Sequence, residues 1–345
     1  MPELEDSLSP EQILKNKEIS GGHKYDDPSD LKVTPVETPE HFNLPNNKPV
    51  DQINDTALPE VKPEQNYVLD LGWKNLPVTM LPSRGLFYPE GTKIAIRPAD
   101  VKEIRQFSTI DEDDMLDIDE KLNLIIDACC RMNFSSEGVV SYKDLKQEDR
   151  FFIIMTIRDL TFVKGENRII ISPDNNCNTD GCKGVDAIEL RTGVLSNYIL
   201  DEKLMKFYSI HERKFVFPIK RTGTVIKMGV PSIGVTKQIS DFVKRSVRKG
   251  IDVDESFIKI APFYFDEWRD IDDIKIRKAM LDSESWSKEE FSAYFQLSEK
   301  IKIGTKLNVT VVCDKCGEGE VTAPIYFPGG FRSLFLISDI FGELL

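Results

Sequence analysis

The pattern of apolar and polar residues predicts strands and helices in the first half of the chain after residue 66. Residues 92–97 alternate as in a strand, and residues 100–107 fit the start of a helix or an edge strand. Apolar residues spaced by four, three, one and three positions between Ile118 and Cys129 mark one face of a helix. The same pattern from Leu145 to Leu160 predicts a second helix.

The second half has its own set of predicted elements. Residues 214–218 and 222–228 fit the two strands of a hairpin, and the spacing of Ile239, Phe242, Val243 and Val247 predicts a helix that ends near Gly250. The later predicted elements are helical residues 254–281 with a break near Pro262, a helix over 287–300 that opens on a Ser287/Glu290 capping box, and strands over 306–312 and 320–327.

The first 66 residues differ in composition from the rest of the 345-residue chain. They carry 14 acidic and 6 basic residues, which is a net charge of −8 out of −13, and nine of the nineteen prolines. A segment so poor in apolar residues cannot bury enough surface to offset its ordering entropy. We therefore expect residues 1–66 to be a disordered acidic, proline-rich arm, which either orders along a partner or remains a solvated tail.

Two cysteine pairs are the strongest chemical signal in the sequence. Cys177 and Cys182 follow the β-like run 168–172, and Cys313 and Cys316 follow the run 307–312. Thiolates presented from tight turns after strands are typical of the two knuckles of a zinc ribbon. A site with four thiolates has no open coordination position, so we predict a structural zinc ion rather than a catalytic one.

Other states of these cysteines remain open. Two disulfides are possible. However, the acidic start of the chain, residues 1–6, lacks the apolar core of a secretory signal. Because a cytosolic chain keeps its thiols reduced, we expect a bound metal rather than disulfides. A redox-active Cys-x-x-Cys usually opens a helix, whereas Cys313 follows a predicted strand. The remaining pair, Cys129 and Cys130, is interpreted as two small core residues.

The sequence gives little indication of catalysis, membrane insertion or nucleic-acid binding. Its histidines are His23, His41 and His211, and it has neither a glycine-rich phosphate loop after a strand nor a Gly-x-Ser-x-Gly motif. No apolar run reaches the ~18 residues of a membrane span. The acidic charge argues against general nucleic-acid binding. The chain is therefore expected not to be an enzyme, not to enter a membrane, and not to bind nucleic acid.

Two surface features nevertheless suggest contacts with other molecules. The helix near residues 237–249 carries a basic patch, which consists of Lys237, Lys244, Arg245, Arg248 and Lys249. Three interpretations are open: a solvated face, a docking face for an acidic neighbour, or a nucleic-acid site. The C-terminal residues 328–345 are strongly apolar, so they are expected to be tucked into the fold or buried in another subunit.

Several of these motifs together resemble a known family. They are the segment Leu-Pro-Ser-Arg-Gly-Leu-Phe-Tyr at 81–88, the strand at 93–97, the two helices ending in Ile-Arg-Asp at 157–159, both cysteine pairs and a Phe-rich end. This combination is similar to the baseplate hub proteins of contractile-tailed, T4-like bacteriophages and their hub assembly relatives. The similarity is closer over 76–190 than over 305–335. The chain departs from the family pattern in two ways. Four residues separate Cys177 and Cys182 where two are expected, and the acidic arm and the long 192–304 insertion make the chain larger than the typical member.

The resemblance implies a non-enzymatic role as a component or assembly factor of the tail baseplate hub. Its partners would be other phage tail and baseplate proteins, and its location the virion tail baseplate or the host cytoplasm during assembly. A zinc-ribbon adaptor in phage or host transcription, acting through the basic patch, is the alternative. The predicted fold is an α+β protein with four segments. A disordered arm (1–66) is followed by a small mixed core with the first cysteine knuckle (67–191), a hairpin and helical insertion (192–304), and the second cysteine knuckle with the apolar end (305–345). The two knuckles are expected to form a zinc-ribbon-like staple.

Overall fold

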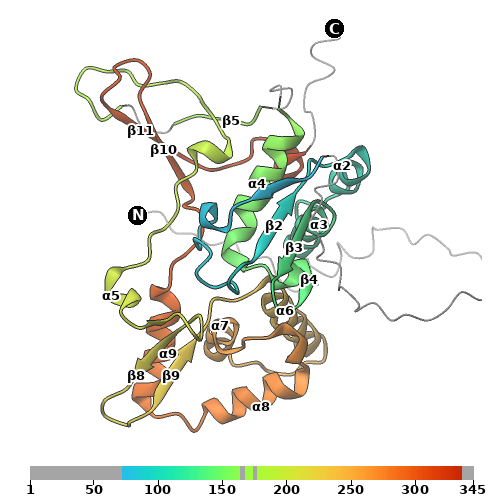
Figure 1. Cartoon of the computed structure of the whole chain (residues 1–345), viewed down its shortest axis with the longest axis vertical. Helices are drawn as coiled ribbons and strands as arrows, with labels where there is room; N and C mark the ends of the chain where they lie inside the picture. Colours follow the sequence, from blue (N-terminus) through green and yellow to red (C-terminus); the bar gives the residue numbers. More distant parts are fainter. Residues whose placement is uncertain (1–71, 164–167, 174–176, 336–345) are drawn as a thin grey trace, which may run out of the picture. The chain divides into compact units, whose positions relative to one another are not determined.

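The computed structural model describes residues 72–163, 168–173 and 177–335. These residues form helices and antiparallel strands (Figure 1), which confirms the α+β class. The predicted arm at residues 1–66 and the last part of the apolar end, residues 336–345, lie outside the described residues.

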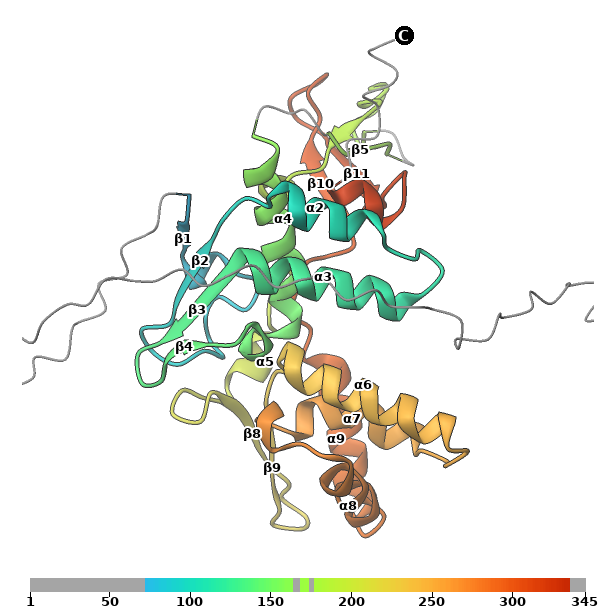
Figure 2. The same cartoon turned by 90° about the vertical axis from the view of Figure 1, so that its right-hand side faces the viewer.

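The first part of the described chain is a four-stranded antiparallel sheet with three helices. The sheet has the order β1-β2-β3-β4, and it consists of β1 (Lys74–Leu76), β2 (Lys93–Ile96), β3 (Cys130–Phe134) and β4 (Gly138–Val140). The helices are α2 (Val101–Ser108), α3 (Met115–Cys129) and α4 (Arg150–Thr161) (Figure 2). The apolar face predicted between Ile118 and Cys129 is buried in the core of this part.

The second helix predicted in this part begins later than expected. Leu145 is buried but lies outside α4, because residues 142–149 form two short 3-10 turns, Tyr142–Asp144 and Gln147–Asp149. The backbone of this segment instead forms a hydrogen bond with the start of the insertion helix: Ile233 N donates to Leu145 O at 2.8 Å. A local apolar pattern therefore predicted burial correctly and the helix boundary wrongly.

The insertion predicted over 192–304 has a small sheet and a group of helices with apolar clusters of their own. Its elements are α5 (Glu202–Met205), β7 (Tyr208–Ser209), β8 (Lys214–Pro218), β9 (Val225–Met228), α6 (Ile233–Arg248), α7 (Glu255–Tyr264), α8 (Asp273–Ser283) and α9 (Lys288–Lys300). One cluster contains Phe215 and Met228 with Ile301, and the other contains Phe242 and Phe257.

Most local predictions for the insertion are confirmed. Strands β8 and β9 pair as a hairpin, and Ser287 and Glu290 form the predicted capping box of α9. The predicted break near Pro262 is found after Tyr264, and Pro262 itself lies inside α7. Val247 shares the predicted face of α6 but is 68% exposed, so it is not a core residue.

Polar contacts attach the insertion to the first part. The buried carboxylate of Asp144 accepts from Trp268 Nε1 at 2.9 Å and from both terminal nitrogens of Arg269 at 2.9 and 2.7 Å. Gly234 lies against Trp268, because a Cβ atom at this glycine would be 2.4 Å from the indole Cγ. Gln147 N donates to Pro231 O at 2.9 Å. These contacts fix the start of α6 on the first part.

Two short hairpins complete the described chain. They are formed by β5 (Ile170–Ile171) with β6 (Ile188–Glu189), and by β10 (Asn308–Val312) with β11 (Glu320–Pro324). Apolar residues of both hairpins belong to the core of the first part; they are Ile171, Ile188, Val309, Val321 and Ala323. The C-terminal residue described, Phe335, is fully buried against Phe107, with 5.1 Å between ring centroids.

Candidate metal centre

The fold brings the four predicted cysteines together at the tips of the two hairpins. The sulfur atoms of Cys177, Cys182, Cys313 and Cys316 all lie within 4.8 Å of one another. Cys177 Sγ is 3.5 Å from Cys316 Sγ, and Cys182 Sγ is 3.7 Å from Cys313 Sγ. These cysteines, separated by more than 130 positions along the chain, therefore form one cluster.

The sulfur spacing fits a metal ion and does not fit disulfides. Zinc–sulfur bonds of ~2.3 Å in a tetrahedral site place the sulfurs ~3.8 Å apart, whereas a disulfide needs ~2.05 Å. The four cysteines are free thiols, and the closest pairs are at 3.5 and 3.7 Å. The cluster could therefore hold a metal ion with all four coordination positions filled by protein. Such a closed set of ligands leaves no position for a substrate.

The second hairpin presents its cysteines through a tight turn. Cys313 directly follows β10, and its N–H donates to Gly319 O at 2.7 Å. Gly317 N donates to Cys313 O at 2.7 Å, and Gly317 has a φ of 72°, a left-handed conformation that favours glycine. The turn therefore directs Cys313 and Cys316 to the same side.

The first knuckle is joined to the second by backbone contacts. Asn178 N donates to Glu320 O at 3.1 Å, and Glu320 N donates to the side chain of Asn178 at 2.8 Å. Gly319 lies directly against this knuckle, because a Cβ atom there would be 2.1 Å from Cys177 Sγ and 2.3 Å from Thr179 Oγ1. A side chain at position 319 would therefore separate the two cysteine pairs.

Backbone N–H groups surround the sulfur atoms. Thr179 N lies 3.4 Å from Cys177 Sγ, Gly184 N 3.4 Å from Cys182 Sγ, and Gly319 N 3.2 Å from Cys316 Sγ. Such donors stabilise thiolates, which are the form that binds metal.

The thiols differ in how readily they ionise. Hydrogen bonds from the backbone N–H groups of Glu318 and Gly319 lower the pKa of Cys316 to about 6. The N–H of Gly184 lowers the pKa of Cys182, but burial and hydrogen bonds to the other three thiols outweigh it and raise that pKa to about 11. Of these two thiols, Cys316 therefore ionises more readily than Cys182.

The basic patch on α6 is partly neutralised by neighbouring carboxylates. Lys237 and Lys244 lie 3.8 and 3.7 Å from the carboxylate of Asp241, and Arg245 pairs with Asp273 at 2.6 Å. These ion pairs reduce the positive charge that α6 presents to solvent.

Sequence reasoning missed the residue that organises the family-like segment 81–88. Asp149 is fully buried, and it accepts hydrogen bonds from Ser83 N at 2.8 Å, from Ser83 Oγ at 2.7 Å and from Tyr88 Oη at 2.7 Å. Burial raises the pKa of Asp149, and the hydrogen bonds from Ser83 and Tyr88 oppose that rise. The sequence shows Asp149 only as an acidic residue just before an apolar helix, and an exposed helix N-cap has the same pattern.

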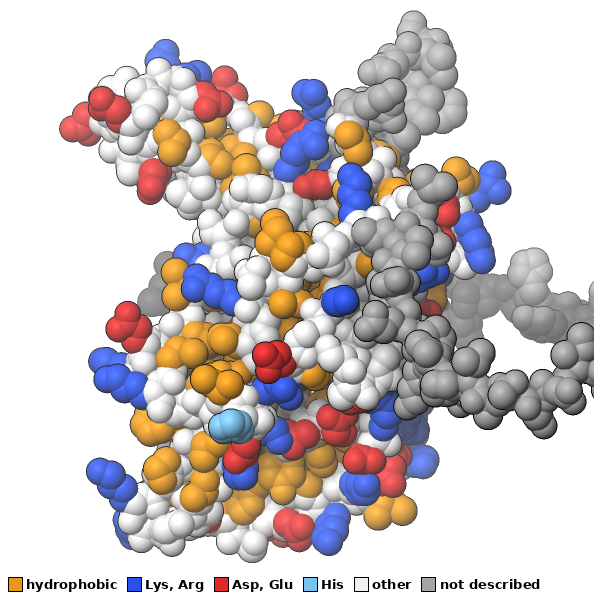
Figure 3. Space-filling view, viewed as in Figure 1, with side chains coloured by type: hydrophobic (Ala, Val, Ile, Leu, Met, Phe, Trp, Pro, Cys, Tyr) orange, Lys and Arg blue, Asp and Glu red, His pale blue; other side chains and the backbone are white. Residues whose placement is uncertain are grey.

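A histidine-based active site is not found among the described residues. His211 is the one histidine in this part of the chain, and it is exposed on the surface (Figure 3). Among the described helices, none is both long and apolar enough to cross a membrane.

Comparison of the chain with protein-family models, with curated proteins and with solved structures finds no match. The resemblance to baseplate hub proteins therefore rests on the sequence motifs themselves.

Proposed function

We propose that this protein is a component or assembly factor of the tail baseplate hub of a contractile-tailed bacteriophage, with a structural zinc ion at its four cysteines. It acts by contacts with other tail proteins, in the virion baseplate or in the host cytoplasm during assembly. The observation that carries this proposal is the joining of the family-like segment and the two cysteine hairpins in one core.

Three positions of the family-like segment, Ser83, Gly85 and Tyr88, have a structural role. Ser83 and Tyr88 hold the buried Asp149. Gly85 has a φ of 78°, and a Cβ atom there would lie 2.9 Å from Val78 Cγ2. The spacing Pro-Ser-x-Gly-x-x-Tyr therefore describes a compact loop fixed on the core, and this supports treating the motif as a unit rather than as a chance match.

An open apolar groove beside the second hairpin supports a role in protein contacts. It has a volume of about 510 Å³, and its apolar lining residues are Phe151, Leu307, Ile325, Tyr326, Phe327 and Phe331. Leu307 is 76% exposed and Tyr326 is 43% exposed. Exposed aromatic and aliphatic side chains gathered in a groove are typical of surfaces that become buried on assembly.

We prefer this function to that of a transcription adaptor because of the charges on α6. The adaptor would use Lys244 and Arg245 to contact phosphates, whereas these side chains face Asp241 and Asp273. The proposed baseplate role does not require free positive charge on α6.

The assembly role is tested by co-expression with the baseplate proteins of a contractile-tailed phage and purification through a tag on this chain. We expect a defined tail protein to co-purify at fixed stoichiometry, and Leu307→Asp to abolish the complex. Ile210→Asp is the matched control, because Ile210 is 78% exposed but lies outside the groove. If no baseplate protein binds, or if both variants bind equally, the proposed role or its surface is wrong.

The zinc site is tested by elemental analysis of the purified full chain. We expect one zinc per chain, lost in Cys316→Ser and retained in Cys129→Ala, which removes a buried thiol outside the cluster. The apolar residues of both hairpins belong to the main core, so the secondary structure should survive loss of the metal while the melting temperature falls. Absence of metal from the native protein would contradict the proposal.

A further inference from the structure

The apolar groove beside the second hairpin lies next to the last residues that the structure describes. Phe327 and Phe331 both line the groove, and their ring centroids are 5.4 Å apart. Phe331 begins the short 3-10 turn Phe331–Leu334, and the residue after this turn, Phe335, is fully buried against Phe107. Because a 3-10 helix rises ~2 Å per residue, residues 336–345 start from a fixed point that is only ~8 Å along the turn from Phe331.

The sequence of residues 336–345 has the pattern of an amphipathic helix. Its apolar residues occupy positions 336, 337, 340, 341, 344 and 345, so they recur after one and three residues. This spacing places all six side chains on one half of a helix, with Asp339 and Glu343 on the other half. A helix of ten residues is marginal in water by itself, so its stability depends on a surface that covers the apolar half.

The groove offers a fixed apolar surface for such a helix. Its volume is about 510 Å³. Phe151, Ile325 and Phe327 line it, and these partly buried side chains pack against the main core. Leu307 and Tyr326, which are 76% and 43% exposed, extend the apolar surface toward solvent. The inner wall of the groove is therefore anchored, and its outer part has apolar area left to bury.

The charges around the groove favour an acidic occupant. Its lining contains two cations, Arg150 and Lys306, and one carboxylate, Glu148. Arg150 already pairs with Asp119, whereas Lys306 is exposed at the edge of the groove. Residues 336–345 carry two carboxylates and no basic residue. The segment and the groove are therefore complementary in charge as well as in apolar surface.

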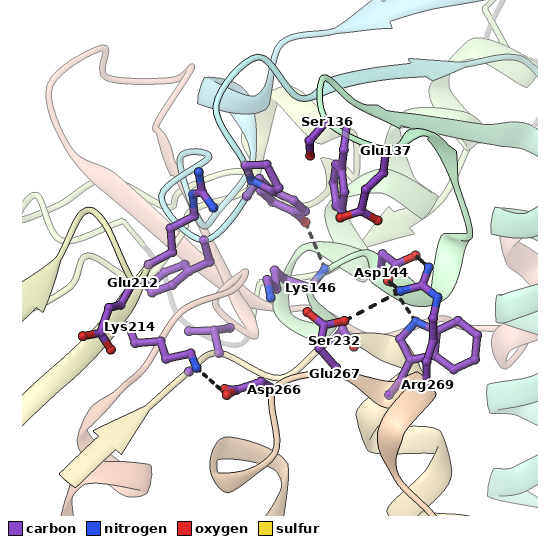
Figure 4. A pocket seen from close by; sticks show the side chains of 18 of the residues that line it. Ser136, Glu137, Asp144, Lys146, Glu212, Lys214, Ser232, Asp266, Glu267 and Arg269 are labelled. Atoms are coloured by element: carbon purple, nitrogen blue, oxygen red, sulfur yellow. Dashed lines mark hydrogen bonds and ion pairs between the residues drawn. The ribbon is translucent and has the colours of Figure 1, made fainter.

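The polar cavity at the junction with the insertion does not suit this segment. It has a volume of about 400 Å³. Figure 4 shows ion pairs among the side chains that line it, between Lys214 and Asp266 and between Arg269 and Asp144. An apolar helix face placed over these groups would remove them from water without giving them new hydrogen bonds.

We propose that residues 336–345 fold back as an amphipathic helix and cover the apolar groove of their own chain, with their carboxylates beside Lys306. A ten-residue helix is ~15 Å long, which is enough to lie across Leu307 and Tyr326. The connection from Phe335 is short, so the effective concentration of the segment at the groove is in the millimolar range, which favours its own chain over a second copy.

The covered groove adds a regulatory step to the proposed function, and in that respect the inference rests on it. A tail protein that binds the groove must first displace residues 336–345. The free protein would then hide its contact surface until a partner competes for it, which limits premature association through exposed apolar side chains. The contact itself is a property of the isolated chain and can be measured without a partner.

The test is hydrogen–deuterium exchange on the full-length protein, followed by mass spectrometry of its peptides. We expect the backbone amides of residues 337–345 to exchange at least ~10-fold more slowly than those of a free peptide with the same sequence. Leu307→Asp, which places a charge in the groove, should return the exchange to the rate of the free peptide. Val247→Asp is the matched control, because Val247 is 68% exposed in a separate apolar hollow at the end of α6.

Two further variants change one partner of the contact each. Phe341→Asp should abolish the protection from the side of the segment, and Lys306→Glu should reduce it several-fold by reversing the charge at the edge of the groove. Exchange in the wild-type protein as fast as in the peptide, or protection that survives Leu307→Asp, would overturn the proposal. Protection that disappears on dilution together with a dimer would assign the groove to a second copy and overturn it as well.

The outcome is separable from that of the baseplate role. Protection of residues 337–345 in a chain that binds no tail protein would support this contact and leave the baseplate role without support. A tail protein that binds a chain whose residues 337–345 are unprotected would support the baseplate role and contradict this contact.

Discussion

Tyr88 Oη donates to Asp149 Oδ2 across 2.7 Å and accepts from Lys146 N at 3.0 Å. One hydroxyl thus joins the end of the family-like segment to the turn before α4. The carboxylate of Asp149 is fully buried and has two further hydrogen bonds from Ser83. The half-buried N–H of Lys146 is satisfied by the Tyr88 hydroxyl. The same residue therefore fixes the loop 81–88 on the backbone of the turn that contains Lys146.

Removal of this hydroxyl should destabilise the protein. We expect Tyr88→Phe to lower the free energy of unfolding by ~1–3 kcal/mol, because a hydrogen bond to the buried carboxyl group of Asp149 is lost and the half-buried amide of Lys146 is left without this acceptor. Urea unfolding measures the loss. Tyr326→Phe is the control, since that tyrosine is 43% exposed. Equal stability of the two variants would show that the Asp149 network contributes nothing.

The burial of Asp149 shows what the sequence could not provide. Its donors come from Ser83, 66 positions earlier, and the sequence pattern around residue 149 shows only acidic residues before a helix. Local patterns succeeded where the cause is local: the spacing from Ile118 to Cys129 predicted α3, and Ser287 with Glu290 predicted the start of α9. Long-range polar pairing leaves no such periodic signal.

The four-cysteine cluster was predictable in its residues but not in its construction. Cysteine spacing identified Cys177, Cys182, Cys313 and Cys316, because thiol pairs in turns have few other uses in a reduced protein. The contact of Gly319 with the first knuckle depends on how two distant hairpins meet. The prediction that Val247 on α6 is a core residue was wrong for a related reason. Periodicity defines a helix face, but it does not show how far neighbouring helices cover that face.

Glu103 should make stability depend on pH. Its carboxylate accepts from Arg97 Nη2 at 2.9 Å and from Asp100 N at 2.8 Å. Burial acts to raise the pKa of Glu103, but the hydrogen bonds from Arg97 and from the backbone lower it overall. A lowered folded-state pKa gives stability that is present above the unfolded-state value of ~4.3 and is lost as the pH falls through the folded-state value.

We therefore expect Glu103→Gln to reduce the free energy of unfolding by ~1–2 kcal/mol at pH 7. The difference from wild type should stay constant down to about pH 5 and shrink below about pH 4. Urea unfolding at a series of pH values measures it. Glu299→Gln, an exposed change at the end of α9, should have little effect at any pH. A Glu103→Gln difference that persists unchanged in acid would contradict the ion pair.

Gly319→Ala should weaken metal binding without removing a ligand. The added methyl group would lie 2.1 Å from Cys177 Sγ, so the hairpins must move apart and the sulfur cluster must open. We expect at least ~10-fold weaker metal affinity, about the loss seen when groups that orient metal ligands are removed. Competition with a chelator measures it. Gly193→Ala is the control, because its Cβ atom meets nothing within 4 Å. Equal affinities would show that the hairpins adjust freely.

The contact of Asp144 with Arg269 should be a strong coupling between the first part of the chain and the insertion. The Asp144 side chain is 8% exposed and accepts two bonds from the guanidinium and one from Trp268 Nε1. Removal of Arg269 leaves the buried Asp144 carboxylate with the bond from Trp268 alone, whereas the Arg269 guanidinium is 43% exposed and water can reach it when Asp144 is removed. In a double-mutant cycle of Asp144→Ala and Arg269→Ala we expect a coupling energy of ~1–3 kcal/mol.

Arg269→Lys separates geometry from charge in this contact. Lysine keeps the positive charge but cannot reproduce the two parallel hydrogen bonds, so we expect it to recover only part of the stability lost in Arg269→Ala. The half-exposed pair Lys237 and Asp241, at 3.8 Å on α6, is the matched control and should couple by no more than ~0.5 kcal/mol. If the two cycles give the same coupling, the attachment of the insertion depends on the packing of Trp268 against Gly234 rather than on the Asp144 ion pair.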